Sequence, residues 1–251
     1  MSSYSPSIDA VFISDLHLNP NEPDIQERFQ RFVKWAALHT KSVYILGDFF
    51  HVWAGDDSLD EWSESIASEL SWLAGQGVSL FYIHGNRDFL IGNDFAKRAS
   101  LQILPDPTVI NCNGQRVLLT HGDQYCSNDR GHQWLRRITR NRLFSFVFLR
   151  IPYHLRSKWV NQMRQQSERN KRKPMWSMDI VPSTMLLEMS HMHADIVIHG
   201  HIHQPGLTHH SCRGRDYRQY VLSDWDDNPK VLCYYISKGF SFILLAERCN
   251  A

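Results

Sequence analysis

The stretch AVFISDLH, residues 10–17, is a run of apolar residues that leads into Asp15 and His17. A short run of this kind predicts a buried β-strand, with both polar side chains directly after it. The same arrangement recurs at four further places, each time with an oxygen-bearing or imidazole side chain after the run. These runs are VYILG before Asp48, LFYIHG before Asn86, VLLT before His121, and DIVIHG before His201 and His203.

Side chains at the ends of neighbouring strands can meet at one edge of a sheet, so these seven are candidates for a single site. Carboxylate, amide and imidazole donors suit a hard-to-borderline divalent ion such as Mn²⁺ better than a thiolate-bound zinc. Seven ligands are too many for one ion and suit two. Two ions about 3.5–4 Å apart can activate water and neutralise charge on a phosphoryl group. The pattern therefore predicts a two-metal phosphoesterase, with Asp48 as the carboxylate that bridges the ions.

The order of strands and helices predicts an α/β fold. From residue 9 to about 119, short apolar runs alternate with helical patterns over residues 24–39 and 59–74. Such alternation favours helices packed on a mainly parallel sheet. Closely spaced strand candidates after Gly200 predict a second, more antiparallel sheet, and hence a sandwich of two mixed β-sheets flanked by helices. These candidates are YRQYVLSDW at 217–225, VLCYYIS at 231–237 and FSFILLA at 240–246.

The charge distribution sets one segment apart. The chain of 251 residues has a net charge of only +1, yet residues 130–173 carry thirteen basic residues and one acidic residue. The remaining sequence carries 14 basic and 25 acidic residues. We therefore expect a core of residues 1–128 and 176–251 that carries a basic helical cap, residues 129–175, with its helices broken near Pro152 and Pro174.

The cysteines and the N-terminus predict a cytoplasmic location. The five cysteines are an odd number without CxxC spacing, which is typical of reduced thiols. The sequence MSSYSPSIDAVFISDLH, residues 1–17, lacks the features of a secretion signal. The apolar stretch LFSFVFL, residues 143–149, is far too short to span a bilayer.

The candidate ligands lie in motifs that resemble a known family. Asp15-x-His17, Gly47-Asp48, Gly85-Asn86, His121-Gly122 and Gly200-His201-x-His203 resemble the five motifs of the calcineurin-like metallophosphoesterases, in the same order over residues 10–205. The resemblance implies one ion held by Asp15, His17, Asp48 and His203. It implies a second ion held by Asp48, Asn86, His121 and His201.

One position departs from the general family. The motif asparagine is usually followed by a histidine that can protonate a poor leaving group, whereas Arg87 follows Asn86 here. A phosphoanhydride needs no such acid, because its leaving group is a phosphate with a second pKa near 6. Arg87 can instead hold a diphosphate oxygen bidentately, although it could also be a surface residue paired with Asp88. The departure points to pyrophosphate cleavage.

Longer strings resemble a narrower family, the UDP-2,3-diacylglucosamine pyrophosphatases of lipid A biosynthesis in Gram-negative bacteria. They are ILGDFFHVWAGDD at 45–57, IHGNRDFLIG at 83–92 and HGDQYCSND at 121–129. The resemblance implies attack of metal-activated water on the α-phosphorus, which releases UMP and 2,3-diacylglucosamine 1-phosphate (lipid X). It implies Asp48, Asn86, Arg87 and His201 as catalytic residues.

The same resemblance implies a set of substrate contacts. Asn86, Arg87, Asp129 and His201 match within the core motifs, and Ser167 matches the cap serine in MRQQSERN, residues 163–170. Asn170 and Lys173 fit the cap asparagine and lysine only if one residue is deleted after Ser167, and Lys171 is a possible substitute.

The basic cap leaves three interpretations open: a nucleic-acid surface, a solvated helical face, or a surface that lies against an anionic membrane. A lipid with a diphosphate head favours the membrane, so we expect Arg136, Arg137 and Arg140 to face the cytoplasmic side of the inner membrane, and no nucleic-acid partner. Other functions left open are a phosphoesterase for another nucleotide diphosphate or a cyclic nucleotide, and a nucleic-acid-binding protein.

Other polar residues are weaker candidates. His209, His210 and Cys212 lack a fourth metal ligand, so a polar loop is expected there. Cys126 is expected to be a packing residue. Three residues of the GDFFHVWAGDD stretch, residues 47–57, could lie near the metal site and orient its ligands. They are His51, Asp56 and Asp57.

Overall fold

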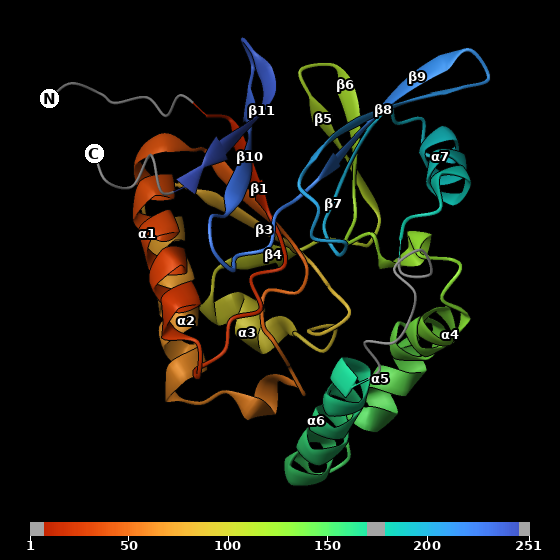
Figure 1. Cartoon of the computed structure of the whole chain (residues 1–251). Coiled ribbons are helices and arrows are strands. Elements are labelled where there is room, and N and C mark those ends of the chain that lie inside the picture. Colours follow the sequence, from red (N-terminus) through yellow and green to blue (C-terminus); the bar gives the residue numbers. More distant parts are fainter. Residues whose placement is uncertain (1–7, 170–178, 246–251) are drawn as a thin grey trace, which may run out of the picture.

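The computed structural model describes residues 8–169 and 179–245, which form two β-sheets with helices outside them (Figure 1). The first sheet has six strands in the order β11-β10-β1-β2-β3-β4. Strands β1 (Ala10–Ile13), β2 (Ser42–Leu46), β3 (Ser79–Ile83) and β4 (Leu101–Ile103) run parallel to one another. Strands β10 (Lys230–Tyr235) and β11 (Gly239–Leu244) continue the sheet beyond β1 in antiparallel pairing.

The second sheet is mixed and has the order β5-β6-β7-β9-β8. Its strands are β5 (Thr108–Cys112), β6 (Gln115–Leu119), β7 (Ile196–His199), β8 (Gly206–Cys212) and β9 (Arg215–Val221). The predicted α/β sandwich of two mixed sheets is confirmed. The prediction that the strands after Gly200 form a sheet of their own is wrong, because β8 and β9 join β7 while β10 returns to β1. Apolar runs identify strands but not their pairing partners.

Alternating side chains tie the first sheet to two different layers. In β1, Val11 and Ile13 face α1 (Pro23–His39), α2 (Glu61–Gly75) and α3 (Asn93–Arg98), which cover the outer face. Ala10 and Phe12 point the other way and pack between the two sheets. The helix α7 (Pro182–His191) covers the outer face of the second sheet with Met185 and Met189. The layers are therefore helix, sheet, sheet and helix.

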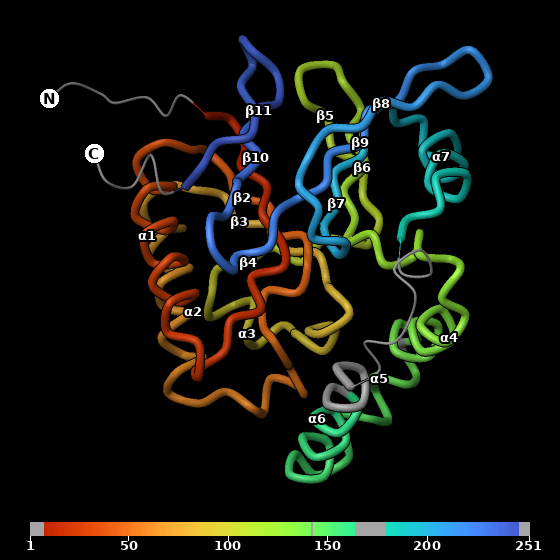
Figure 2. Tube along the Cα trace, in the orientation of Figure 1, coloured from red at the N-terminus to blue at the C-terminus, as the bar shows by residue number. Residues whose placement is uncertain are grey.

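Three helices lie apart from this sandwich, as the cartoon and the Cα trace both show (Figures 1 and 2). They are α4 (Arg130–Thr139), α5 (Arg142–Phe148) and α6 (Tyr153–Arg169), between β6 and β7 in the sequence. A short 3-10 helix, Asp123–Tyr125, leads into them, and another lies at Asp56–Ser58. The expected helical break near Pro152 is present, and that near Pro174 lies outside the described residues.

Within residues 8–169 and 179–245, no helix combines the length and the apolar character that crossing a membrane requires.

Candidate metal centre

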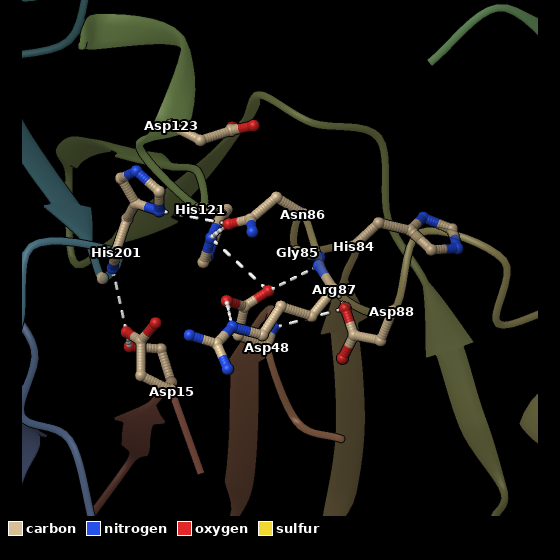
Figure 3. Close-up of polar contacts among 12 residues, drawn as sticks. Asp15, Asp48, His84, Gly85, Asn86, Arg87, Asp88, His121, Asp123 and His201 are labelled. Carbon is tan, nitrogen blue, oxygen red and sulfur yellow. Dashed lines mark hydrogen bonds and ion pairs between the residues drawn. The ribbon is translucent and has the colours of Figure 1, made fainter. Parts of the chain in front are cut away.

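The ends of β1, β2, β3, β6 and β7 bring the seven predicted ligands to one edge of the sandwich. Figure 3 shows Asp15, Asp48, Asn86, His121 and His201 among them. Asn86 Oδ1 lies 2.9 Å from His121 Nε2 and 3.1 Å from His201 Nδ1. His121 Nε2 lies 3.7 Å from Asp48 Oδ1. Four of the seven side chains therefore surround one point.

The remaining ligands form an adjoining group on the other side of Asp48. His203 Nε2 lies 3.3 Å from Asp15 Oδ1 and 3.5 Å from His17 Nε2. His17 Nδ1 is 4.0 Å from Asp48 Oδ2. The two Asp48 oxygens thus face different groups, which is the arrangement that a bridging carboxylate needs.

The spacing and chemistry of these donors fit divalent ions. Two ligand atoms that each lie about 2.1 Å from one ion are roughly 3 Å apart, close to the separations around Asn86 and His203. Ligand atoms of Asp15, His17 and His203 all lie within 4.8 Å of one another, as do those of Asp15, Asp48 and His121. The donors are oxygen and imidazole nitrogen, which divalent ions of intermediate hardness accept.

The backbone at this edge is held in an unfavourable conformation. Non-glycine residues with φ near +55° carry a cost on the order of 1–3 kcal/mol each and concentrate at functional sites. Five of the seven ligands have such positive φ values: Asp15 (56°), His17 (53°), Asp48 (51°), His201 (69°) and His203 (53°). These backbone conformations therefore lower the stability of the fold, and they direct the side chains toward one another.

Glycines in the motifs allow the loops to approach closely. A Cβ atom on Gly85 would collide with the backbone nitrogen and Oδ1 of Asp48. A Cβ atom on Gly200 would collide with Oδ2 of Asp15. Any side chain at either position would push apart two ligand loops.

Buried charge of both signs shifts the pKa values of the ligands. Burial raises the pKa of Asp48 to about 6. Burial alone lowers the pKa of His121, but the Asp48 and Asp15 carboxylates outweigh it and raise that pKa to about 9. Burial and the neighbouring His121 lower the pKa of His201 to about 3. Asp48 and Asp15 thus stabilise a positive charge on His121, and the same carboxylates could stabilise a bound cation.

Arg87 belongs to this site and not to the surface. Its Nε lies 3.3 Å from Asp48 Oδ2, and its backbone N–H donates to Asp48 Oδ1 at 2.9 Å. Its Nη1 lies 3.4 Å from His51 Nδ1. The alternative that Arg87 pairs with Asp88 is wrong, because Asp88 is buried and accepts backbone N–H groups from the β2 and β3 end loops.

Two carboxylates near the ligands were missed in the sequence. Asp224 Oδ2 lies 3.5 Å from His203 Nδ1, the ring nitrogen that faces away from Asp15. Asp224 follows the strand β9 just as the ligands follow theirs, so the same pattern could have identified it. Asp123 is fully buried, and the positive charges of His121 and Arg136 outweigh burial and hold its pKa far below the ordinary range.

The histidine His132 was also missed. Its ring lies 5.5 Å from the ring of His201, measured between centroids. Because His132 belongs to α4, it brings the first of the three outlying helices against the ligand group. Nothing in the spacing of the sequence motifs predicts this contact, which depends on how α4 docks.

The predicted substrate contacts of the cap are only partly described. The Asp129 side chain accepts a hydrogen bond from His132 N at 3.0 Å and thereby caps α4. Ser167 lies in the last turns of α6. Asn170, Lys171 and Lys173 lie outside the described residues.

Arg136 and Arg140 hold α4 on the core. Arg136 Nε lies 3.1 Å from Asp123 Oδ2, and Arg140 Nη2 donates to the His84 carbonyl at 2.9 Å and the Gly85 carbonyl at 3.2 Å. Only about a fifth of each arginine side chain is exposed, at 21% and 20%. The prediction that these two arginines face a membrane is wrong. Arg137, between them, is exposed.

The weaker candidates divide by location. His51 lies at the site, with its ring 6.4 Å from that of His17. Asp56 instead accepts N–H groups at the start of α3, and Asp57 pairs with Arg156 of α6, so the expectation that these two orient metal ligands has no support. The expected polar loop at 209–212 is wrong, because these residues belong to the edge strand β8. Cys126 is buried, as a packing residue should be.

The sequence of the chain is similar to those of known metal-dependent phosphoesterases. A model of the calcineurin-like phosphoesterase family matches residues 9–205. The UDP-2,3-diacylglucosamine hydrolase of Pseudomonas paraeruginosa is 41% identical over 87% of this chain and 92% of its own. The enzyme of that name from Edwardsiella ictaluri is 42% identical over 88% of this chain and 86% of its own. The chain belongs to the UDP-2,3-diacylglucosamine hydrolase family of calcineurin-like phosphoesterases.

Membership of this family makes the protein a metal-dependent hydrolase, and the polar group at the strand ends supplies candidate ligands for divalent ions. A further hydrolase of the family, from Aeromonas salmonicida, is 39% identical over 90% of this chain and 89% of its own. A solved phosphoesterase from E. coli is 13% identical, with a TM-score of 0.48 over 95% of this chain and 94% of that chain.

Proposed function

We propose that this protein hydrolyses the pyrophosphate bond of UDP-2,3-diacylglucosamine in lipid A biosynthesis. Water attacks the α-phosphorus, the bond to the bridging oxygen breaks, and UMP and 2,3-diacylglucosamine 1-phosphate leave. The observation that carries the proposal is Arg87, which lies against Asp48 in the midst of the ligand group. It takes the position at which the general family usually has a histidine. The hydrolase names of relatives at about 40% identity support the substrate.

The metal ligands divide into two sets that share Asp48. We assign Asp15, His17, Asp48 and His203 to one ion and Asp48, Asn86, His121 and His201 to the other, in accord with the two groups of short contacts. We propose Mn²⁺ for both, because the donors are oxygen and imidazole without thiolate. Two such ions supply an activated water molecule and neutralise charge on the phosphoryl oxygens.

Arg87 is proposed to hold the diphosphate for in-line attack. The Asp48 carboxylate and the His51 ring restrain its guanidinium. A fixed guanidinium can donate two parallel hydrogen bonds to phosphate oxygens and stabilise the charge that develops in the transition state. The leaving 1-phosphate has a second pKa near 6, so it departs without a proton donor.

The helices α4–α6 are proposed to form a cap for the lipid part of the substrate, over residues 129–175. Asp129, at the start of α4, and Ser167, Asn170 and Lys173 remain the proposed contacts on this side. Asn86 and His201 are proposed to contact the phosphate as well as the ion. His132 brings α4 directly against His201, which supports a substrate site between cap and core.

We propose that the cap also lies against the anionic cytoplasmic surface of the inner membrane. Large apolar side chains are exposed on all three helices, among them Trp134, Leu143, Phe146 and Trp159. Arg150 stacks over the Phe146 ring at 3.5 Å, so positive charge and apolar surface occur together. This combination favours peripheral binding to anionic lipids.

Vesicle flotation tests the membrane proposal. Leu143→Ser with Phe146→Ser should weaken binding to anionic vesicles, whereas Leu38→Ser with Leu187→Ser, which removes equally exposed apolar residues of α1 and α7, should not. Arg137→Glu should also weaken binding. Equal flotation of all variants would refute the proposal.

The substrate assignment is tested with purified protein, Mn²⁺ and UDP-2,3-diacylglucosamine. We expect release of UMP, and little hydrolysis of a cyclic nucleotide or of UDP-glucose. Efficient cleavage of those substrates but not of the lipid would favour a phosphoesterase of another specificity. Salt-dependent DNA binding without UMP release would favour a nucleic-acid-binding protein, an interpretation weakened by the buried pairing of Arg136 and Arg140.

A further inference from the structure

A cavity of about 320 Å³ opens beside the metal centre. The loop after β1, the segment from His51 to Ser63, and one face of α6 form its walls. This volume lies at the lower end of the roughly 300–1,000 Å³ that is typical of small-molecule sites. No residue assigned above as a metal ligand lines it, so it is a separate compartment from the ligand group.

His51 joins the cavity to the reaction centre. It lines the cavity wall, and its Nδ1 lies 3.4 Å from Arg87 Nη1. Leu18, the residue after the ligand His17, lines the same wall. A group attached to a phosphate held by Arg87 could therefore extend past His51 into the cavity.

The cavity wall has the chemistry of a nucleoside site. Amide and hydroxyl side chains supply hydrogen-bond donors and acceptors, and aromatic rings supply flat apolar surface. The polar members include Asn19, Asn21, Ser58, Ser157 and Asn161, and the aromatic members are Trp53, Trp62 and Tyr153. A nucleobase has a π-face and a polar edge and matches such a wall, whereas an acyl chain would leave the polar groups without partners.

One face of α6 is polar and lines the cavity, and the opposite face is apolar. Tyr153, Ser157 and Asn161 are spaced by four residues, so they share the face that lines the cavity. Leu155, Trp159 and Met163 are exposed apolar residues shifted by two positions. A two-residue shift rotates a side chain by about 200° around an α-helix, so the apolar stripe points away from the cavity. The helix separates a polar compartment from an apolar surface.

We propose that this cavity binds the uridine of the substrate. The inference rests on the proposed function and assigns the two ends of the substrate to opposite sides of α6. The α-phosphate lies at Arg87 and the metal centre, the nucleoside passes His51 into the cavity, and the diacylglucosamine lies on the side of the apolar stripe. Tyr153 and the two tryptophans contact the base or ribose, and the amide side chains bind their polar edges.

A cavity-filling variant tests the assignment. Ser157→Phe places a ring in the cavity, and His154→Phe, on the same helix but outside the cavity, is the matched control. Steady-state inhibition by UMP should weaken about tenfold or more in Ser157→Phe, the scale of one lost stacking contact. Inhibition by 2,3-diacylglucosamine 1-phosphate should change less than about twofold, and the control should match the natural protein.

Two results would overturn the proposal. One is unchanged UMP inhibition in Ser157→Phe, and the other is weakened inhibition by the lipid phosphate alone or by both products equally. If Ser157→Phe does not fold, Asn161→Phe is used with the same readouts. Quenching of tryptophan fluorescence by UMP, which Trp53 and Trp62 can report, tests the cavity without turnover. Failure of the natural protein to cleave UDP-2,3-diacylglucosamine would instead sink the proposed function, and UMP quenching separates the two.

Discussion

The metal-binding edge of the sandwich and the three outlying helices are built on opposite principles. At the edge, Asp15, Asp48 and His121 are at most 2% exposed, and the backbone of the two aspartates is held at positive φ. In α4, all of whose residues are described, none is buried, and Trp134 is 65% exposed. One region fixes a few polar atoms, and the other displays broad apolar surface.

Under the proposed function, this difference assigns one part of the substrate to each region. Charge that develops on phosphorus needs donors that do not reorganise, and the edge provides them. Lipid chains need area more than exact positions, and the helices provide area. The two regions are joined by polar contacts of Arg136, Arg140 and Arg156. Each prediction below disturbs one region or the junction and asks whether the other responds.

Loss of the bridging carboxylate should have the largest effect. Asp48→Asn removes the charge that both ligand groups share, so we expect loss of bound metal and a fall in kcat greater than the roughly 10–100-fold cost of losing an outer partner. Metal content and UMP release measure this. The control is Asp9→Asn, which breaks the exposed Lys41 pair of 2.7 Å far from the ligands. Retained activity in Asp48→Asn would contradict the two-metal site.

The edge, but not the helices, should respond to pH through metal binding. The raised pKa of His121, about 9 against an ordinary 6.5, means that the metal-free protein is protonated there at neutral pH. A metal ion must displace that proton, so affinity should rise with pH by up to about tenfold per unit and level off above pH 9.

In the metal-free protein, the contribution of His121 to stability falls as pH rises, whereas metal affinity increases. The raised pKa of His121 stabilises the metal-free fold fully below pH 6.5, and this contribution is lost as pH rises through 9. The difference between the melting temperatures with and without Mn²⁺ should therefore increase from pH 6.5 through 7.5 to 8.5. A difference in melting temperature that does not change with pH would contradict the prediction that metal displaces a proton from His121.

The sequence predicted the edge much better than the junction. A polar residue after each apolar strand is local information, and parallel strands carry their C-terminal ends to one edge, so the seven predicted ligands lie together in the structure. The partner of β10 and the docking of α4 depend on contacts between distant segments, which spacing does not encode. Hence Arg136 and Arg140 were predicted as surface charges, and His132 was missed. Asp224 was missed although it lies three residues after the end of β9.

Arg87 tests whether geometry or charge matters at the edge. Arg87→Lys keeps the positive charge but loses the planar fork that donates two hydrogen bonds. We expect kcat to fall about 100-fold, the scale for one lost transition-state donor, with metal content unchanged. A matched control is Arg116→Lys, an exposed arginine that binds the Met192 and His193 carbonyls. Equal activity of Arg87→Lys and the natural protein would leave Arg87 without the proposed role.

Asp224 should act on the metal centre through His203. Asp224→Asn removes the carboxylate 3.5 Å from His203 Nδ1, so the ring loses part of its orientation. We expect metal affinity to fall about tenfold, measured by calorimetry, while saturating Mn²⁺ restores most activity. Asp227→Asn, at an exposed position, should change neither. Unchanged affinity in Asp224→Asn would show that His203 is oriented without it.

The smallest effect should come from the junction. Arg140→Ala removes the hydrogen bonds to the His84 and Gly85 carbonyls and the pairing with Asp106, so α4 should open more often. Since the ligands keep their own strand-end positions, we expect only a few-fold loss of kcat, together with faster hydrogen exchange in α4. Arg137→Ala is the neighbouring exposed control. If Arg140→Ala instead abolished metal binding, the edge would depend on the helices, and the two regions could not be treated as separate in function.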